Sequence, residues 1–346
     1  MAYRAPARLG LGLTVFGCER DEADLFNELA PRFGIVPTIT NDAVSAATVS
    51  AAPANRCVSV GHKCEISEPT LRALHEAGVE YISTRSIGFD HIDLDAAKTL
   101  GIAVENVVYA PDGVADYTLM LILMAIRNAK AVLCSAERHD FRLGTVRGQD
   151  LRDMTVGVLG VGHIGSAVIQ RLQGFGCRVL AYSNRPAATR AANFVSFDEL
   201  LRESDIVTLH LPLNAGTHHF IGREQIETMK PGAFLVNTGR GALVDTEALL
   251  LALESGKLGG AALDVLEGEN GLFYFDYTTR QVDHHLLLRL QRLPNVIVTP
   301  HTAYYTTRTL HDTVEGTLMK CLTFERNRAN EDAQARDLVR GLLGRT

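Results

Sequence analysis

The sequence predicts an α/β protein with two doubly wound parallel sheets, each in a domain of its own. The chain has 346 residues, more than one hydrophobic core usually holds, so two domains are expected. Short apolar runs alternate with helical patterns over residues 9–110, and again from Thr155 to Pro300. This alternation is typical of a parallel sheet with helices on its faces.

The first series of runs predicts the N-terminal sheet. Strands are expected at 57–61 (CVSVG), 79–84 (VEYIST) and 102–107 (IAVENV). Helices are expected at 70–78 and at 93–101, the second with Gly101 as its C-cap. Two arginines precede an apolar run near the N-terminus, as in a signal peptide. Because glycines interrupt that run and a helical pattern follows at once, we expect a first strand and helix there instead.

A turn and an apolar helix join the two series. The turn signal lies at 109–113 (YAPDG), and the helical stretch 114–126 is apolar on nearly every side. Such a helix is buried, either in a core or at a subunit interface. The polar stretch 138–154 that comes after it is expected to be a surface loop.

The second series predicts a complete dinucleotide-binding unit of six parallel strands. The six runs are TVGVLG, RVLAY, IVTLHLP, AFLVNT, GAALDV and VIVTP. Residues 304–330 have a helical pattern and are expected to return to the first domain. Residues 331–346 are charged and broken by glycine, so we expect a mobile or weakly docked tail.

The composition limits the classes of function. Apolar residues make up 46% and charged residues 21% of the chain, an ordinary globular balance. The formal net charge of -6 argues against a nucleic-acid partner, and no apolar run is long enough to cross a membrane. None of the six cysteines forms a CxxC pair, so neither a zinc site nor a disulfide framework is expected. Reduced thiols in a cytoplasmic enzyme are the simplest interpretation.

A glycine motif opens the second series. Gly160, Gly162 and Gly165 form G-x-G-x-x-G between a predicted strand and a predicted helix. The first glycine permits a tight turn, the second lets the backbone approach a pyrophosphate, and the third lets helix and strand pack closely. The helix start at His163 and Ile164 offers free N–H groups to the phosphates. Dinucleotide binding is favoured over the alternative of a merely tight turn.

The end of the second strand departs from the usual motif. An acidic residue normally stands there and binds the ribose 2′-hydroxyl. Here the strand ends on Ser183, Asn184 and Arg185. A carboxylate would repel a 2′-phosphate, whereas a serine hydroxyl and an arginine would accept one. The hypothesis is NADPH or NADH as cofactor, with NADPH favoured; the alternative is a neutral loop with Arg185 in solvent.

Three residues form a candidate catalytic set. Arg240, Glu269 and His301 each follow an apolar strand, and ligands of open α/β sheets bind outside the carboxyl ends of strands. In a 2-keto acid reductase, His301 would donate the proton and Glu269 would orient its ring. Arg240 would hold the substrate carboxylate and polarise the keto oxygen.

Each of these residues also has a structural alternative. Arg240 could form a loop salt bridge, Glu269 could be a solvated acid, and most of the 12 histidines must be structural or exposed. The joint occurrence with a nucleotide fold favours the active-site interpretation. We expect no metal site, because the adjacent residues Asp283, His284 and His285 diverge on a helix.

The ordered motifs resemble the D-isomer-specific 2-hydroxyacid dehydrogenases. The motifs are GVGHIG, NTGRGALVD, LDVLEGE and TPHTAYY, and the resemblance extends to about residue 328. Within the family the chain is similar to the D-lactate dehydrogenases, because the segment between Glu269 and His301 is long. It looks closest to those of vancomycin-resistance clusters (VanH type), which make D-lactate for D-alanyl-D-lactate cell-wall precursors.

The resemblance implies a domain arrangement, an activity and an assembly. A Rossmann NAD(P)-binding domain at 112–303 would be inserted in a flavodoxin-like substrate domain made of 1–111 and 304–330. The implied activity is reduction of pyruvate to D-lactate with NAD(P)H. Besides a second copy of the chain, the only expected partner is this small-molecule substrate. The implied assembly is a homodimer, with the apolar helix 114–126 in its interface.

The resemblance also assigns residues. Arg240, Glu269 and His301 match the catalytic positions, and the loop at Ile87 and Gly88 matches the one that binds the substrate carboxylate. Further matches are the pocket positions Tyr109 and Tyr304, the nicotinamide position Asp264, and the cofactor contacts Pro212, Thr238 and Gly239. Bulky Tyr304 would leave a small pocket that suits pyruvate, unless it only packs the hinge.

Two alternatives stay open at this point. One is reduction of glyoxylate, hydroxypyruvate or a larger 2-keto acid. The other is a nucleotide-sensing binding protein of the corepressor kind, because that class can retain the same three residues.

Overall fold

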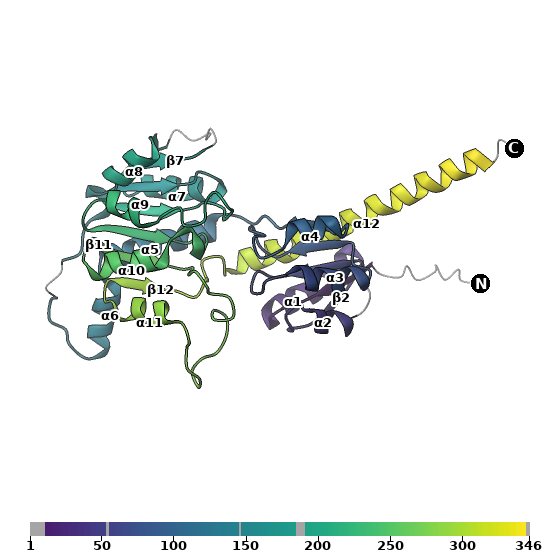
Figure 1. Ribbon diagram of the computed structural model, residues 1–346, viewed down its shortest axis with the longest axis horizontal. Coiled ribbons are helices and arrows are strands. Elements are labelled where there is room, and N and C mark those ends of the chain that lie inside the picture. The colour runs from purple at the N-terminus through teal and green to yellow at the C-terminus, as the bar shows by residue number, and fades with distance from the viewer. Residues whose placement is uncertain (1–10, 53–54, 145–146, 185–190, 344–346) are drawn as a thin grey trace. The chain divides into compact units, whose positions relative to one another are not determined.

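The chain forms two compact units, one inserted in the other. The computed structural model describes residues 11–52, 55–144, 147–184 and 191–343 (Figure 1). The first unit holds the chain up to Ala110 and from Thr307 onward, and the second is Pro111–Thr306. The crossings predicted from the sequence are 111/112 and 303/304, within three residues of these positions.

The first unit is built on a five-stranded parallel sheet. Its strand order is β2-β1-β3-β4-β5. The strands are β1 (Leu11–Val15), β2 (Ile35–Ile39), β3 (Cys57–Val60), β4 (Tyr81–Thr84) and β5 (Ala103–Asn106). The β2 strand, IVPTI, contains Pro37 and was not among the predicted strands. A strand tolerates proline at the edge of a sheet, where β2 lies, because a missing N–H breaks no central ladder.

Helices cover both faces of this sheet. They are α1 (Arg20–Leu29), the 3₁₀ turn η1 (Ala30–Phe33), α2 (Ala46–Ser50), α3 (Glu68–Glu76), α4 (Leu94–Thr99) and α12 (Thr307–Leu343). One face packs on α1 and α12, the other on α2, α3 and α4. The α12 helix continues past residue 331 to Leu343, where a tail was expected. Alanine, arginine and leucine are the most frequent helix formers in that stretch.

The second unit is built on a seven-stranded parallel sheet of order β12-β11-β10-β9-β6-β7-β8. Its strands are β6 (Thr155–Leu159), β7 (Arg178–Tyr182), β8 (Asn193–Phe194), β9 (Ile206–Leu209), β10 (Ala233–Asn237), β11 (Leu258–Leu263) and β12 (Val296–Val298). The six expected strands are confirmed, and β8 is a short extra edge. The chain order reverses between β6 and β9, the switch point at which open α/β sheets bind ligands.

Alternate residues of each central strand enter two separate cores. In β10, Leu235 packs toward α8, α9, α10 and α11, whereas Val236 packs toward α5 and α7. Both faces are therefore buried, as parallel sheets require. The helices are α5 (Asp112–Ile126), α6 (Ala129–Glu137), α7 (His163–Gln173), α8 (Phe197–Glu203), α9 (Arg223–Thr228), α10 (Thr246–Glu254) and α11 (His285–Arg292), with 3₁₀ turns η2 (Leu151–Asp153) and η3 (Gly241–Leu243).

The apolar α5 lies largely in the core of the second unit. It packs against α7, β10 and β11, and Leu121 and Ile122 are fully buried. Among the described residues, no single helix is long and apolar enough to cross a membrane. The pair of α5 and α6, bent by 71°, passes that test by length and composition only.

Candidate active site

The turn between β6 and α7 has the geometry that a pyrophosphate needs. Gly160 has φ +91°, and a Cβ there would lie 2.5 Å from the His210 carbonyl oxygen. A Cβ on Gly165 would lie 2.0 Å from the Gly160 carbonyl oxygen. At Gly162, by contrast, a Cβ would meet nothing within 4 Å. Gly160 and Gly165 therefore close the turn. Gly162 leaves open space before the free N–H groups of His163 and Ile164 at the start of α7. These residues fit a dinucleotide.

The end of β7 carries no acid among its described residues. Ser183 follows the strand and is half-buried, and Asn184 is exposed. Arg185, the third residue predicted at this strand end, lies outside the described residues. This strand end therefore carries the Ser183 hydroxyl and the Asn184 amide. NAD-binding units usually have an acidic residue there, which binds the ribose.

The loop after β9 contributes a neutral imidazole beside the glycine turn. Burial lowers the pKa of His210 to about 4, and its Nε2 lies 3.1 Å from Thr208 Oγ1. His210 is therefore uncharged at neutral pH. Pro212, two residues later, is exposed.

Asp264 at the end of β11 anchors the loop that carries His301. Its carboxylate accepts hydrogen bonds from Thr299 Oγ1 (2.6 Å), Thr302 N (3.0 Å) and Ala303 N (2.8 Å). Its carbonyl oxygen accepts one from His301 N at 2.7 Å. Asp264 is fully buried, so these donors replace the water that a buried carboxylate loses.

His301 is in direct contact with Glu269. The His301 Nδ1 lies 2.6 Å from Glu269 Oε1, and the two side chains are 11% and 18% exposed. The other carboxylate oxygen, Oε2, accepts a hydrogen bond from Leu266 N at 2.6 Å. His301 has φ +53°, a left-handed conformation that is rare for a histidine. The Glu269–His301 pairing expected from the sequence is thus present.

Tyr274 holds the backbone of His301 and was not expected from the sequence. Its hydroxyl donates to the His301 carbonyl oxygen at 2.7 Å. Burial raises the pKa of Tyr274 well above its ordinary value, and the neighbouring Tyr304 and Glu269 act in the same direction. The phenol therefore keeps its proton and remains a donor. Tyr304 meets the His301 ring edge-on, with ring centroids 6.1 Å apart.

Arg240 follows β10 in a loop that abuts the Glu269 turn. Asn237 fixes this loop, because its side chain accepts from Gly239 N (3.0 Å) and donates to the Arg240 carbonyl oxygen (2.8 Å). A Cβ on Gly241 would lie only 2.0 Å from the carbonyl carbon of Leu266. The loop of Arg240 and the turn of Glu269 are therefore in backbone contact. Thr238 Oγ1, just before, lies 2.9 Å from Thr118 Oγ1 of α5.

Three of the expected substrate residues lie in the first unit. Ile87 and Gly88 follow β4, and Tyr109 follows β5. Asn106 Nδ2 donates to the Ile87 carbonyl oxygen at 2.6 Å, and Ser86 Oγ donates to that of Gly88 at 2.6 Å. With both carbonyls bonded to side chains, this loop is held at the carboxyl edge of its own sheet.

Comparison with known proteins decides the family. The family model for "D-isomer specific 2-hydroxyacid dehydrogenase, NAD binding domain" matches residues 119–303. The chain belongs to the D-isomer specific 2-hydroxyacid dehydrogenases. It is an NAD-binding oxidoreductase of that family, and it reduces 2-keto acids to D-2-hydroxyacids.

Similar proteins cover almost the whole chain. A D-specific alpha-keto acid dehydrogenase of Enterococcus faecium is 62% identical over 93% of this chain and 99% of its own length. The protein of the same description from Enterococcus faecalis is 59% identical over 94% of this chain and 100% of its own. Among solved structures, the pyruvate reductase of Chlamydomonas reinhardtii has a TM-score of 0.82 at 31% identity, covering 91% of this chain and 96% of its own.

Proposed function

We propose that this 2-hydroxyacid dehydrogenase reduces pyruvate to D-lactate, with His301 as the proton donor. The observation that carries the proposal is the 2.6 Å contact between His301 Nδ1 and Glu269 Oε1. With Glu269 ionised, Nδ1 donates its hydrogen to the carboxylate. Nε2 is then the nitrogen that carries a proton to the keto oxygen.

The other residues bind and orient the substrate. The Arg240 guanidinium would pair with the substrate carboxylate and polarise the keto group. The backbone N–H groups at Ile87 and Gly88 would hold the carboxylate, and Tyr109 and Tyr304 would line the pocket. The bound nicotinamide cofactor supplies the hydride that reduces the keto carbon. Bulk at Tyr304 supports pyruvate over a larger substrate.

We further propose that NADPH is preferred over NADH. The support is Ser183 at the end of β7, where a carboxylate would repel a 2′-phosphate and a hydroxyl would not. Pro212, Thr238, Gly239 and Asp264 complete the proposed cofactor set, from the carboxyl ends of β9, β10 and β11.

A homodimer and a role in antibiotic resistance belong to the same proposal. An apolar hollow lies over α5 and α7, lined by Leu119, Met120, Leu123, Met124 and Phe175 with Asp116 and Arg171. A second copy would cover it. On the motif resemblance alone, we also propose that the enzyme supplies D-lactate for D-alanyl-D-lactate precursors in vancomycin resistance; the similar Enterococcus proteins are described only as D-specific alpha-keto acid dehydrogenases. A neighbouring gene for a D-alanine–D-lactate ligase would be the matching genomic observation.

The deciding experiment measures oxidation of NADPH and NADH at neutral pH with a panel of keto acids. Pyruvate, glyoxylate, hydroxypyruvate and phenylpyruvate are compared, and the product is resolved on a chiral column. We expect the highest kcat/KM with pyruvate and D-lactate as the product. Absence of pyruvate turnover with both cofactors would refute the proposal. Faster turnover of phenylpyruvate than of pyruvate would indicate a substrate preference like that of the aromatic 2-oxoacid reductase of Clostridium sporogenes, which is 37% identical to this chain.

A further inference from the structure

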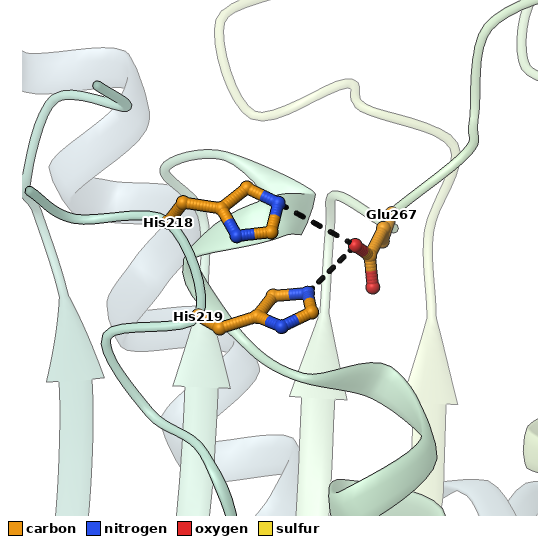
Figure 2. A group of neighbouring side chains, drawn as sticks. All are labelled: His218, His219 and Glu267. Atoms are coloured by element: carbon orange, nitrogen blue, oxygen red, sulfur yellow. Dashed lines mark hydrogen bonds and ion pairs between the residues drawn. The ribbon is translucent and has the colours of Figure 1, made fainter. Parts of the chain in front are cut away.

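Two histidines and a glutamate converge at the surface of the second unit, apart from the His301–Glu269 pair. His218 and His219 lie in the loop after β9, and Glu267 lies in the turn after β11 (Figure 2). Glu267 Oε1 is 2.7 Å from His219 Nε2 and 3.9 Å from His218 Nε2. The two imidazole rings stack with centroids 4.0 Å apart. The side chains of His218, His219 and Glu267 are 55%, 37% and 35% exposed, so an ion can reach them from solvent.

The backbone fixes the two histidines before any ligand binds. His219 has φ +51° and its N–H donates to the Ala242 carbonyl oxygen at 2.8 Å. The His218 N–H donates to the Asn214 carbonyl oxygen at 2.9 Å, closing a turn that the Thr217 hydroxyl also supports. The adjacent side chains therefore leave the loop on the same side, as Figure 2 shows.

Glu267 is fixed from the other side. Its backbone nitrogen is so close to Gly241 that a Cβ on that glycine would approach it to 2.3 Å. His284 Nδ1 accepts a hydrogen bond from Leu287 N, so the ring hydrogen is on Nε2, which donates to the Glu267 carbonyl oxygen at 3.1 Å. Both nitrogens of His284 are thereby occupied, and the Glu267 carboxylate is held facing the two histidines.

We propose that His218, His219 and Glu267 bind a divalent transition-metal ion of the zinc type. Ligand atoms about 2.0–2.1 Å from a tetrahedral ion lie about 3.3 Å from one another. The separations of 2.7 and 3.9 Å from Glu267 Oε1 bracket that value, and all three ligand atoms lie within 4.8 Å of one another, so rotations of the side chains can bring them around one ion. Two imidazoles and a carboxylate suit Zn²⁺, whereas Ca²⁺ and Mg²⁺ take oxygen ligands. Water would complete the coordination at the exposed side.

The ion would join the loop after β9 to the turn that carries Glu269. Glu267 shares this turn with Leu266, whose N–H donates to Glu269 Oε2. With the ion bound, His219 and Glu267 would each coordinate it and would no longer be hydrogen-bonded to one another. Its binding stabilises the folded second unit, because the unfolded chain does not hold these three groups together.

The binding test uses untagged protein stripped of metal with a chelator. Zn²⁺ affinity is measured in competition with a chromophoric chelator, for the wild type and for His218→Ala, His219→Ala and Glu267→Gln. We expect each variant to lose at least about tenfold in affinity, since even outer partners of metal ligands cost that much. His311→Ala is the matched control, because His311 is also exposed and lies 3.8 Å from a glutamate, Glu315. It should bind Zn²⁺ as the wild type does.

Two results would overturn the proposal. One is wild-type affinity in His218→Ala, a variant that removes only an exposed side chain and keeps the His219–Glu267 hydrogen bond. The other comes from Co²⁺ in place of Zn²⁺. Nitrogen and oxygen ligation gives visible bands without thiolate charge transfer, whereas a thiolate band would place the ion on a cysteine. The partly exposed Cys64, Cys134 and Cys177 are the thiols concerned. A melting temperature that rises with Zn²⁺ in the wild type and not in His218→Ala is the supporting result.

Discussion

His301, the proposed proton donor, has an unfavourable backbone conformation. A left-handed conformation costs a non-glycine residue about 1–3 kcal/mol and persists only where the surroundings enforce it. Here Asp264 bonds to both sides of the residue, and Tyr274 bonds to its carbonyl oxygen. The ring direction is then set by the backbone as well as by Glu269. At the scale of the residue, the position of the proposed proton donor depends on Asp264 and Tyr274 as well as on Glu269.

Tyr274→Phe tests this positioning role. The change removes the hydrogen bond to the His301 carbonyl oxygen and leaves the ring in place. We expect kcat to fall about 10- to 100-fold with little change in KM, because small misplacement of a catalytic group is costly. Tyr277→Phe is the control, since that hydroxyl bonds to the Gly271 carbonyl oxygen in an exposed loop. Equal kcat values for Tyr274→Phe and the wild type would remove Tyr274 from the mechanism.

His210 predicts a pH dependence of stability. Its pKa is lowered from 6.5 to about 4 in the folded protein, so the unfolded chain binds the proton more readily. Stability should therefore fall as the pH drops from 6.5 toward 4, by about 1–3 kcal/mol from this group. Denaturant unfolding at pH 5 and pH 7 measures the difference. His210→Gln should reduce it, while replacement of the exposed His75 should not; an unchanged pH dependence in His210→Gln would argue against the burial of a neutral ring.

At the scale of elements, the end of β7 governs the proposed cofactor preference. Ser183→Asp places a carboxylate where a 2′-phosphate would bind. We expect the ratio of kcat/KM for NADPH over NADH to fall at least about tenfold, because juxtaposed like charges cost several kcal/mol. Ser255→Asp makes the same change in charge at the exposed end of α10, before β11 begins, and should leave the ratio unaltered. If the NADPH/NADH ratio of kcat/KM is unchanged in Ser183→Asp, another element determines which cofactor is preferred.

The regular elements were more predictable than the contacts between them. Strands such as β6 and β10 are continuous apolar runs before glycine-rich turns, so their pattern alone indicated them. β2 was not predicted because Pro37 is unusual in a strand. β8 has only two residues, too few to show an alternation of apolar and polar side chains. The Glu269–His301 pairing was foreseen from strand ends and family motifs. The anchoring by Tyr274 was not, because no propensity marks a left-handed histidine and 27 residues separate the two in sequence.

At the scale of the whole molecule, the hollow over α5 and α7 predicts the assembly. Met120 and Phe175 are 39% and 41% exposed beside it, and exposed apolar patches of this kind mark protein contacts. Phe175→Glu should convert the proposed dimer to a monomer, because it buries a charge without a partner. Sedimentation velocity gives the mass. Val36→Glu, at an exposed apolar position of β2, is the control; a dimeric Phe175→Glu would place the interface elsewhere.

The insertion of one unit in the other sets an order for biosynthesis. The core beneath β1 and β3 needs Val314, Leu318 and Cys321 of α12, which leave the ribosome after the whole second unit. The inserted unit has all of its strands available first and can fold while the chain is still being made. Until then, α1 alone covers the face of the N-terminal sheet on which α12 packs, so that this core stays incomplete. Ribosome stalling or a nonsense mutation before Thr307 would therefore release a finished nucleotide-binding unit attached to an incomplete, aggregation-prone partner.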